Sequence, residues 1–212
     1  MLDRRRGLDP AQTVADGYKA IAARYLAWST GAPARLRYLD LLLELLPDSA
    51  DVLELGCGAG EPVTRRLAER HRVVALDVSA AQLELAAGNA PGAQLILADM
   101  ADASFAGGSF DAVASFYALM HVPRERHADL LARIVSWLRP RGLLLLTMGS
   151  SDNPAAIDPD WLGTPMYFSH FDAPTNRALV QRSGVRLIST EVVDEDERDP
   201  GARFLWVLAR RD

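Results

Sequence analysis

Three glycines within five residues form the part of this chain whose residue types and spacing favour chemistry most clearly. Gly56, Gly58 and Gly60 follow an apolar run at 52–55 and lead into a segment expected to be helical. Glycines at such a junction allow a tight turn and let backbone N–H groups approach a ligand closely. The segment is therefore predicted to be a ligand-binding loop.

The spacing of these glycines separates two classes of ligand. A dinucleotide-binding loop has the pattern G-x-G-x-x-G, which would place a third small residue where this chain has Glu61. Here the third glycine comes one residue earlier, and a carboxylate, Glu54, precedes the loop. That carboxylate suits a cationic ligand or hydrogen-bond donors better than a pyrophosphate. An NAD-dependent oxidoreductase is therefore disfavoured.

Alternating strands and helices must position this loop. Short apolar runs typical of buried parallel strands occur at 52–55, 72–76, 94–97, 110–115 and 143–147. Helical segments separate them: Pro62 lies near the start of one, Ser79 and Gln82 predict a capping box for the next, and Pro123 opens another. Before them, two helices are expected, one with an apolar face from Val14 to Trp28 and a second with its leucines at 36, 39, 43 and 46 on one side.

The C-terminal third departs from this alternation. Residues 151–172 are expected to form an aromatic loop, followed by a helix at 174–182 and strands at 186–193 and 203–209. The acidic turn at 194–201 is too short for a crossover helix, so these strands are expected to form an antiparallel hairpin. We predict a doubly wound seven-stranded α/β sheet, mostly parallel, in a single domain spanning 1–212. It comprises N-terminal helices (1–47), a ligand-binding core (48–150), a covering loop (151–172), and a last helix with the hairpin (173–212).

Several motifs in this order resemble class I S-adenosylmethionine (SAM)-dependent methyltransferases. Val52-Leu-Glu-Leu-Gly-Cys-Gly-Ala-Gly60 is similar to their first motif, and the segment from Phe110 to His121 is similar to their fourth. In such enzymes the helix carrying Tyr18-x-x-Ile-Ala-x-x-Tyr25 closes over SAM as a lid. The resemblance implies that the ribose binds Asp77, the adenine lies at Asp99 and Met100, and the methionine part lies beside Phe116. The cofactor residues that it implies are Tyr18, Tyr25, Glu54, Gly56, Cys57, Gly58, Gly60, Asp77, Val78, Gln82, Asp99, Met100 and Phe116.

The resemblance leaves the acceptor side less defined. Methyl transfer needs a base only if the acceptor must lose a proton. His121, at the mouth of the expected site, is the first candidate, and His170 is its rival. Both have alternatives, since His121 could fix a helix start or cover the cofactor. The residues expected near the acceptor are Trp28, Tyr117, Trp161, Met166, Tyr167 and His170.

Composition narrows the range of partners. The net charge of −5 argues against a nucleic acid as the main ligand. The basic run Arg4-Arg5-Arg6 is read as a solvated tail. The single cysteine, Cys57, excludes an internal disulfide, and no cluster has metal-ligand spacing. No apolar run approaches the ~18 residues of a membrane span, and no secretory signal is visible. A cytoplasmic setting is expected, with no metal or membrane partner.

The sequence therefore predicts a methyltransferase that uses SAM and acts on oxygen or nitrogen of a small molecule, without a metal. The alternative is a SAM-binding protein of the same fold that regulates or catalyses a rearrangement, because the motifs encode binding and not transfer. The acceptor, the nucleophilic atom and the choice between monomer and homodimer stay open.

Overall fold

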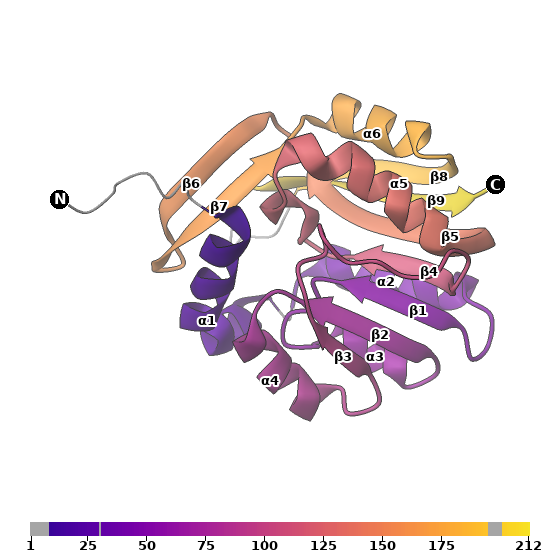
Figure 1. The fold of residues 1–212 in the computed structure, drawn as a ribbon, viewed down its shortest axis with the longest axis horizontal. Helices are drawn as coiled ribbons and strands as arrows, with labels where there is room; N and C mark the ends of the chain where they lie inside the picture. The colour runs from indigo at the N-terminus through magenta and orange to yellow at the C-terminus, as the bar shows by residue number, and fades with distance from the viewer. Residues whose placement is uncertain (1–8, 30, 195–200) are drawn as a thin grey trace.

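The computed structural model describes residues 9–29, 31–194 and 201–212. They form a seven-stranded sheet in the order β3-β2-β1-β4-β5-β9-β8 (Figure 1). The first five strands pair in parallel, and β9 runs antiparallel to both β5 and β8. The predicted sheet and hairpin are confirmed. The strands are β1 Asp51–Leu55, β2 Arg72–Asp77, β3 Gln94–Leu97, β4 Phe110–Ser115, β5 Leu138–Gly149, β8 Val185–Asp194 and β9 Arg203–Arg211.

Two hydrophobic cores lie on opposite faces of this sheet. Helices α2 (Pro33–Leu45) and α3 (Val63–Ala68) cover one face, and α5 (His127–Trp137) and α6 (Ala173–Arg182) cover the other (Figure 1). The chain order reverses between β1 and β4, which are neighbours in the sheet. Ligands of open α/β sheets bind at the carboxyl ends of strands at such a reversal. The glycine loop follows β1 at this point.

The buried face of the second helix matches the leucine pattern only in part, with Leu39 and Leu46 buried as predicted. Tyr38 and Leu42 are buried with Leu39, whereas Leu36 and Leu43 are only half-buried. The ring of Tyr38 stacks on Trp206 of β9, with the ring centroids 4.3 Å apart. Leucines occur all around this helix, so their positions alone do not define which side packs. Arg35 is buried on the same helix.

The predicted covering loop is a hairpin. Residues 151–172 contain β6 (Asn153–Trp161) and β7 (Thr164–His170), which pair antiparallel and lie beside α1 (Pro10–Ser29) in Figure 1. Leu162 and Gly163 connect them with φ values of 50° and 84°. A two-residue hairpin turn with both φ values positive usually carries Asn-Gly. Leucine and the prolines in β6 therefore concealed the hairpin in the sequence.

Other expectations about the elements have mixed outcomes. The helix expected to open at Pro123 begins as a short 3₁₀ helix, Arg124–Arg126, which leads into α5, and a separate 3₁₀ helix, Leu119–His121, precedes the proline. The basic run at 4–6 and most of the acidic turn, residues 195–200, lie outside the described residues. None of the described helices is long and apolar enough to cross a membrane.

The packing of α1 on the hairpin leads to a test with two glycines. A methyl group on Gly17 would lie 2.7 Å from the Met166 terminal carbon and 2.9 Å from the Pro165 carbonyl oxygen. Gly17→Ala should lower the free energy of unfolding by about 1–3 kcal/mol through overpacking. Gly88→Ala, in an exposed part of α4 (Ala80–Asn89) with no atom within 4 Å, should raise it by up to about 1 kcal/mol. Urea unfolding measures both, and equal effects of the two variants would contradict this packing.

Candidate functional site

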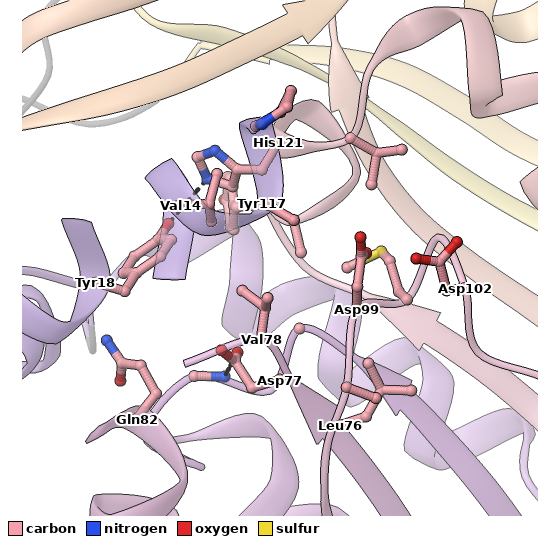
Figure 2. A pocket seen from close by; sticks show the side chains of 18 of the residues that line it. Val14, Tyr18, Leu76, Asp77, Val78, Gln82, Asp99, Asp102, Tyr117 and His121 are labelled. Atoms are coloured by element: carbon pink, nitrogen blue, oxygen red, sulfur yellow. Dashed lines mark hydrogen bonds between the residues drawn. The ribbon is translucent and has the colours of Figure 1, made fainter. Parts of the chain in front are cut away.

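A cavity of about 270 Å³ opens where β1, β2 and β4 end. Its walls come from α1, the glycine loop, the end of β2, and the turns after β3 and β4. Figure 2 shows Asp77, Asp99 and Gln82 around this space, with Tyr18 and His121 at its rim. Most of the predicted cofactor residues line it: Tyr18, Tyr25, Gly56, Gly58, Asp77, Val78, Gln82, Asp99, Met100 and Phe116.

The glycine loop is packed too closely for side chains. Gly56 has φ 75°, and a Cβ atom there would lie 2.3 Å from the Cβ of Ala118. Its backbone N–H donates to the carbonyl of Leu76 at 2.8 Å, which fixes the loop to the end of β2. Gly60 does not line the cavity but packs against Ala86 of α4. Its role in the structure is to let α4 approach the loop.

Asp77 is held in place by the loop that it faces. One carboxylate oxygen accepts from the N–H of Gly58 at 2.8 Å, and the other accepts from the N–H of Ser79 at 2.9 Å. Burial nevertheless raises the pKa of this carboxyl above its usual range, although the backbone donors oppose the shift. A buried carboxylate fixed in this way retains further lone pairs, which face the cavity.

Gln82 provides a second polar group for a ligand. Its side chain is buried, and neither its amide nitrogen nor its amide oxygen has a partner in the protein. The predicted capping box does not form, since Ser79 makes no side-chain bond to the helix. Buried polar atoms without a partner are costly unless a ligand or water bonds to them. Asp77 and Gln82 line the same cavity, so both present polar groups to one ligand.

The part of the cavity wall that follows β3 combines an apolar side chain with a carboxylate. Met100 is buried there, and Asp99 lines the same wall. One Asp99 oxygen accepts from the backbone N–H of Ala101 at 2.8 Å, which fixes the orientation of the carboxylate. A carboxylate beside an apolar side chain can accept from an exocyclic amine while the ring packs on the apolar surface.

Glu54 and Cys57 lie on a smaller cavity of about 30 Å³ beside the first. Glu54 is buried and accepts from the hydroxyl of Thr64 at 2.7 Å. Burial raises the pKa of its carboxyl to about 8, while Thr64 and Arg35 oppose the shift. Burial also raises the pKa of the Cys57 thiol far above its usual value, so the thiol stays protonated. Cys57 is therefore a loop residue and not a nucleophile.

Arg35 is the functional candidate that the sequence analysis missed. It is 7% exposed and lines the same small cavity as Glu54 and the glycine loop. One of its terminal nitrogens donates to the carbonyl of Ser29 at 3.1 Å, but its buried Nε has no partner. A buried guanidinium with a free donor favours a carboxylate ligand. Arg35 lies on the same buried face of α2 as Tyr38 and Leu42. The sequence did not reveal this face, because leucines occur on every side of the helix.

A second cavity, of about 190 Å³, adjoins the first. Side chains from α1, from the β6–β7 hairpin and from the turn after β4 enclose it, and most of them are aromatic. Four residues belong to the walls of both cavities: Tyr18, Tyr25, Tyr117 and His121. Of the expected acceptor residues, Trp28, Tyr117, Trp161 and His170 line it. Phe168, which belongs to the segment expected to cover the acceptor, lines it too, as do Met120 and Phe204, which the sequence analysis did not identify.

Two expected acceptor residues do not line either cavity. Met166 is fully buried against α1, and Tyr167 is buried beside it. Tyr167 nevertheless contributes through its backbone carbonyl, which bonds to His121. His170 does reach the second cavity, and its Nδ1 donates to the carbonyl of Ser151 at 2.7 Å.

His121 has both ring nitrogens engaged. Nδ1 lies 2.8 Å from the carbonyl oxygen of Tyr167, and Nε2 lies 2.9 Å from the hydroxyl of Tyr18. A carbonyl oxygen only accepts, so Nδ1 carries the hydrogen and Nε2 accepts from Tyr18. Burial lowers the pKa of His121 to about 4 and raises the pKa of Tyr18 well above its usual range. Both side chains are therefore neutral at pH 7.

No metal centre accompanies these cavities in the part of the chain that the structure describes. No group of three or more His, Cys, Asp or Glu side chains there is arranged to hold an ion.

Comparison with known proteins agrees with this geometry. A family described as "Methyltransferase domain" matches residues 52–142, from β1 to the start of β5. A trans-aconitate 2-methyltransferase from Deinococcus radiodurans is 39% identical over 131 residues, which are 59% of this chain and 46% of that protein. The chain spans about half the length of the curated relatives that it matches.

Two solved structures extend the likeness over nearly the whole chain. One is a Burkholderia thailandensis 1,6-didemethyltoxoflavin-N1-methyltransferase with bound 1,6-didemethyltoxoflavin and S-adenosylhomocysteine (SAH). It is 20% identical and has a TM-score of 0.74, covering 100% of this chain and 97% of that one. The other is a DhpI–SAH complex, 26% identical with a TM-score of 0.71, covering 95% and 96%. The family match assigns a methyltransferase domain to residues 52–142, and the shared architecture shows that the chain has the fold of SAM-dependent methyltransferases.

Proposed function

We propose that this protein transfers the methyl group of SAM to an oxygen or nitrogen atom of a small molecule. The observation that carries the proposal is the pair of adjoining cavities with a common wall of Tyr18, Tyr25, Tyr117 and His121. The first has the polar groups that an adenosyl ligand needs. The second, enclosed by aromatic side chains, suits an acceptor and excludes water from it.

The residues of the first cavity would hold the cofactor. When bound, SAM supplies an electrophilic methyl carbon, which the acceptor attacks in line with the sulfur leaving group. Asp77 and Gln82 would bind the ribose hydroxyls, and Asp99 would accept from the adenine amine. Arg35 would bind the methionine carboxylate, because it lines the small cavity together with the glycine loop and its Nε has no partner in the protein. The protein's part is to orient both reactants.

The size and composition of the second cavity support a small-molecule acceptor. Its lining includes Trp28, Trp161 and Phe168, which offer apolar surface to a molecule of one or two rings. Two of the similar proteins are named for small-molecule acceptors, trans-aconitate and 1,6-didemethyltoxoflavin. The alternative, a protein that binds SAM without methylating, shares the first cavity. Incubation with methyl-labelled SAM and a panel of small molecules distinguishes the two, because only a methyltransferase transfers the label to one of them.

Calorimetric binding of SAH tests the cofactor assignment directly. We expect micromolar binding of SAH and none of NADH. Asp77→Ala should weaken SAH binding at least tenfold, because the buried carboxylate is lost from the ribose site. Asp40→Ala, which removes an exposed carboxylate paired with Arg66, should leave binding unchanged. Binding of NADH, or equal affinity of SAH for wild-type protein and Asp77→Ala, would contradict the assignment.

The role of Arg35 predicts a selective loss of affinity. Arg35→Gln should weaken binding of SAH about tenfold or more, because a buried charge-assisted hydrogen bond is lost. Binding of 5′-methylthioadenosine, which lacks the amino-acid part, should stay within twofold. Arg37→Gln on the same helix, where an exposed arginine pairs with Glu191, serves as the control. An equal loss for both ligands would instead indicate a general structural defect.

The raised pKa of Glu54 predicts that SAH binding depends on pH. With a pKa of about 8, the carboxyl is mostly protonated at pH 7. The ionised form attracts the ammonium group of the ligand, so affinity should increase from about pH 6 to about pH 8 as the proton is lost. Glu54→Gln should remove this dependence, and Glu84→Gln on exposed α4 should retain it. A pH-independent affinity in the wild-type protein would contradict this role.

A further inference from the structure

The wall shared by the two cavities contains a defined hydrogen-bond chain. It runs from the Tyr18 hydroxyl to His121 Nε2 over 2.9 Å and from His121 Nδ1 to the carbonyl of Tyr167 over 2.8 Å. The hydroxyl donates its hydrogen to Nε2, and its oxygen can accept. Tyr25, whose ring centroid lies 5.0 Å from that of Tyr18, Asp77 and Arg35 are the neighbouring titratable or charged groups. Tyr18 and His121 both line both cavities, so the pair lies between the proposed cofactor site and the proposed acceptor site.

This chain is arranged to take up one proton. If Nε2 gains the hydrogen of Tyr18, both nitrogens of the imidazolium become donors, to Tyr18 and to the Tyr167 carbonyl. No hydrogen bond is broken, and the carbonyl dipole stabilises the new charge. The carbonyl also holds the ring in the tautomer whose Nε2 accepts. His121 lines both cavities as well, and its bond to Tyr18 lets it receive a proton without itself contacting the acceptor.

The chemistry of the second cavity indicates which acceptor could use such a chain. None of its described lining residues is an aspartate or glutamate, and Arg35 is the arginine among them. The guanidinium of Arg35 lies over the ring of Tyr117, 4.8 Å from its centroid. A cationic amine acceptor would meet a cation here and no carboxylate. Stacking surfaces from Trp28, Trp161 and Phe168 favour a flat, uncharged ring system.

We propose that Tyr18 and His121 act together as the proton acceptor for a neutral phenol-like hydroxyl or heteroaromatic N–H bound in the second cavity. This proposal rests on the proposed function and specifies its acceptor. The acceptor's O–H or N–H bond breaks as that atom bonds to the methyl carbon and the sulfonium sulfur takes the electron pair of the broken S–C bond. The acceptor proton goes to the Tyr18 oxygen while the Tyr18 proton goes to His121 Nε2.

The balance of charge favours this route. Before transfer the site holds one positive charge, on the sulfonium, with a neutral acceptor and a neutral imidazole. Afterwards it holds one positive charge on the imidazolium, with neutral products. The charge is therefore moved within the site and not created in it, which limits the cost of a charged histidine in a buried place. Release of the proton to water restores the starting state.

Methylation of 2-naphthol with labelled SAM tests the proposal through its pH profile. With SAM at saturating concentration, so that the pH dependence of cofactor binding does not affect the rate, the wild-type rate should change little between about pH 6 and pH 8, because the chain removes the proton. His121→Gln retains an acceptor for the Tyr18 hydroxyl but no base, so its rate should fall about 100-fold or more near neutral pH. The rate should then rise about tenfold per pH unit as free naphtholate replaces the base. Tyr18→Phe should show the same fall in rate near neutral pH and the same rise with pH as His121→Gln.

Controls separate this role from a structural one. Tyr38→Phe removes a buried hydroxyl that bonds to Glu191, away from both cavities, and should keep the wild-type rate and profile. SAH affinity of Tyr18→Phe and His121→Gln should stay within about threefold of wild type. Loss of rate without recovery at high pH would overturn the proposal. A second result would also overturn it: a wild-type protein that binds SAH and methylates the carboxylate of 2-naphthoate, but methylates no 2-naphthol, one-ring phenol or heteroaromatic N–H compound. Failure to bind SAH would instead overturn the proposed function.

Discussion

The site depends on the buried imidazole of His121, which joins three segments distant in sequence. The residue belongs to the turn after β4, its Nε2 bonds to Tyr18 of α1, and its Nδ1 bonds to the carbonyl of Tyr167 in β7. Each buried hydrogen bond contributes about 1 kcal/mol, but loss of one partner costs more because the other is left unsatisfied. This single ring therefore fixes the first helix and the hairpin against the end of the sheet and separates one cavity from the other.

Buried charge is arranged around this centre in a consistent way. Asp77 and Glu54 are carboxyl groups with raised pKa values, and Arg35 is a guanidinium with a free donor. Such groups destabilise an empty protein and favour a ligand that carries the complementary groups. A methionine tail brings both an ammonium and a carboxylate, and a ribose brings hydroxyl groups. The polar residues of the first cavity thus match the parts of one cofactor. The aromatic cavity beside it is the proposed place of the methyl acceptor.

Sequence patterns predicted the sheet well because its signals are local. Apolar runs define β1, β2 and β4, and the glycine spacing separates the loop at Gly56 from a dinucleotide loop. The hairpin β6–β7 was missed, since Leu162 occupies a turn position that usually takes asparagine or glycine. Arg35 was missed because leucines surround α2 and conceal its buried side. The bond between Tyr18 and His121 joins residues 103 positions apart, and no local pattern encodes it.

A crystal structure of the SAH complex tests the central claim most directly. We predict the ribose between Asp77 and Gln82, the carboxylate of the amino-acid part at the Nε of Arg35, and the sulfur facing the second cavity past Tyr18 and His121. This placement would leave the aromatic cavity open to an acceptor in line with the transferred methyl group. An adenosine lying in the aromatic cavity, or an amino-acid tail directed away from Arg35, would contradict the account.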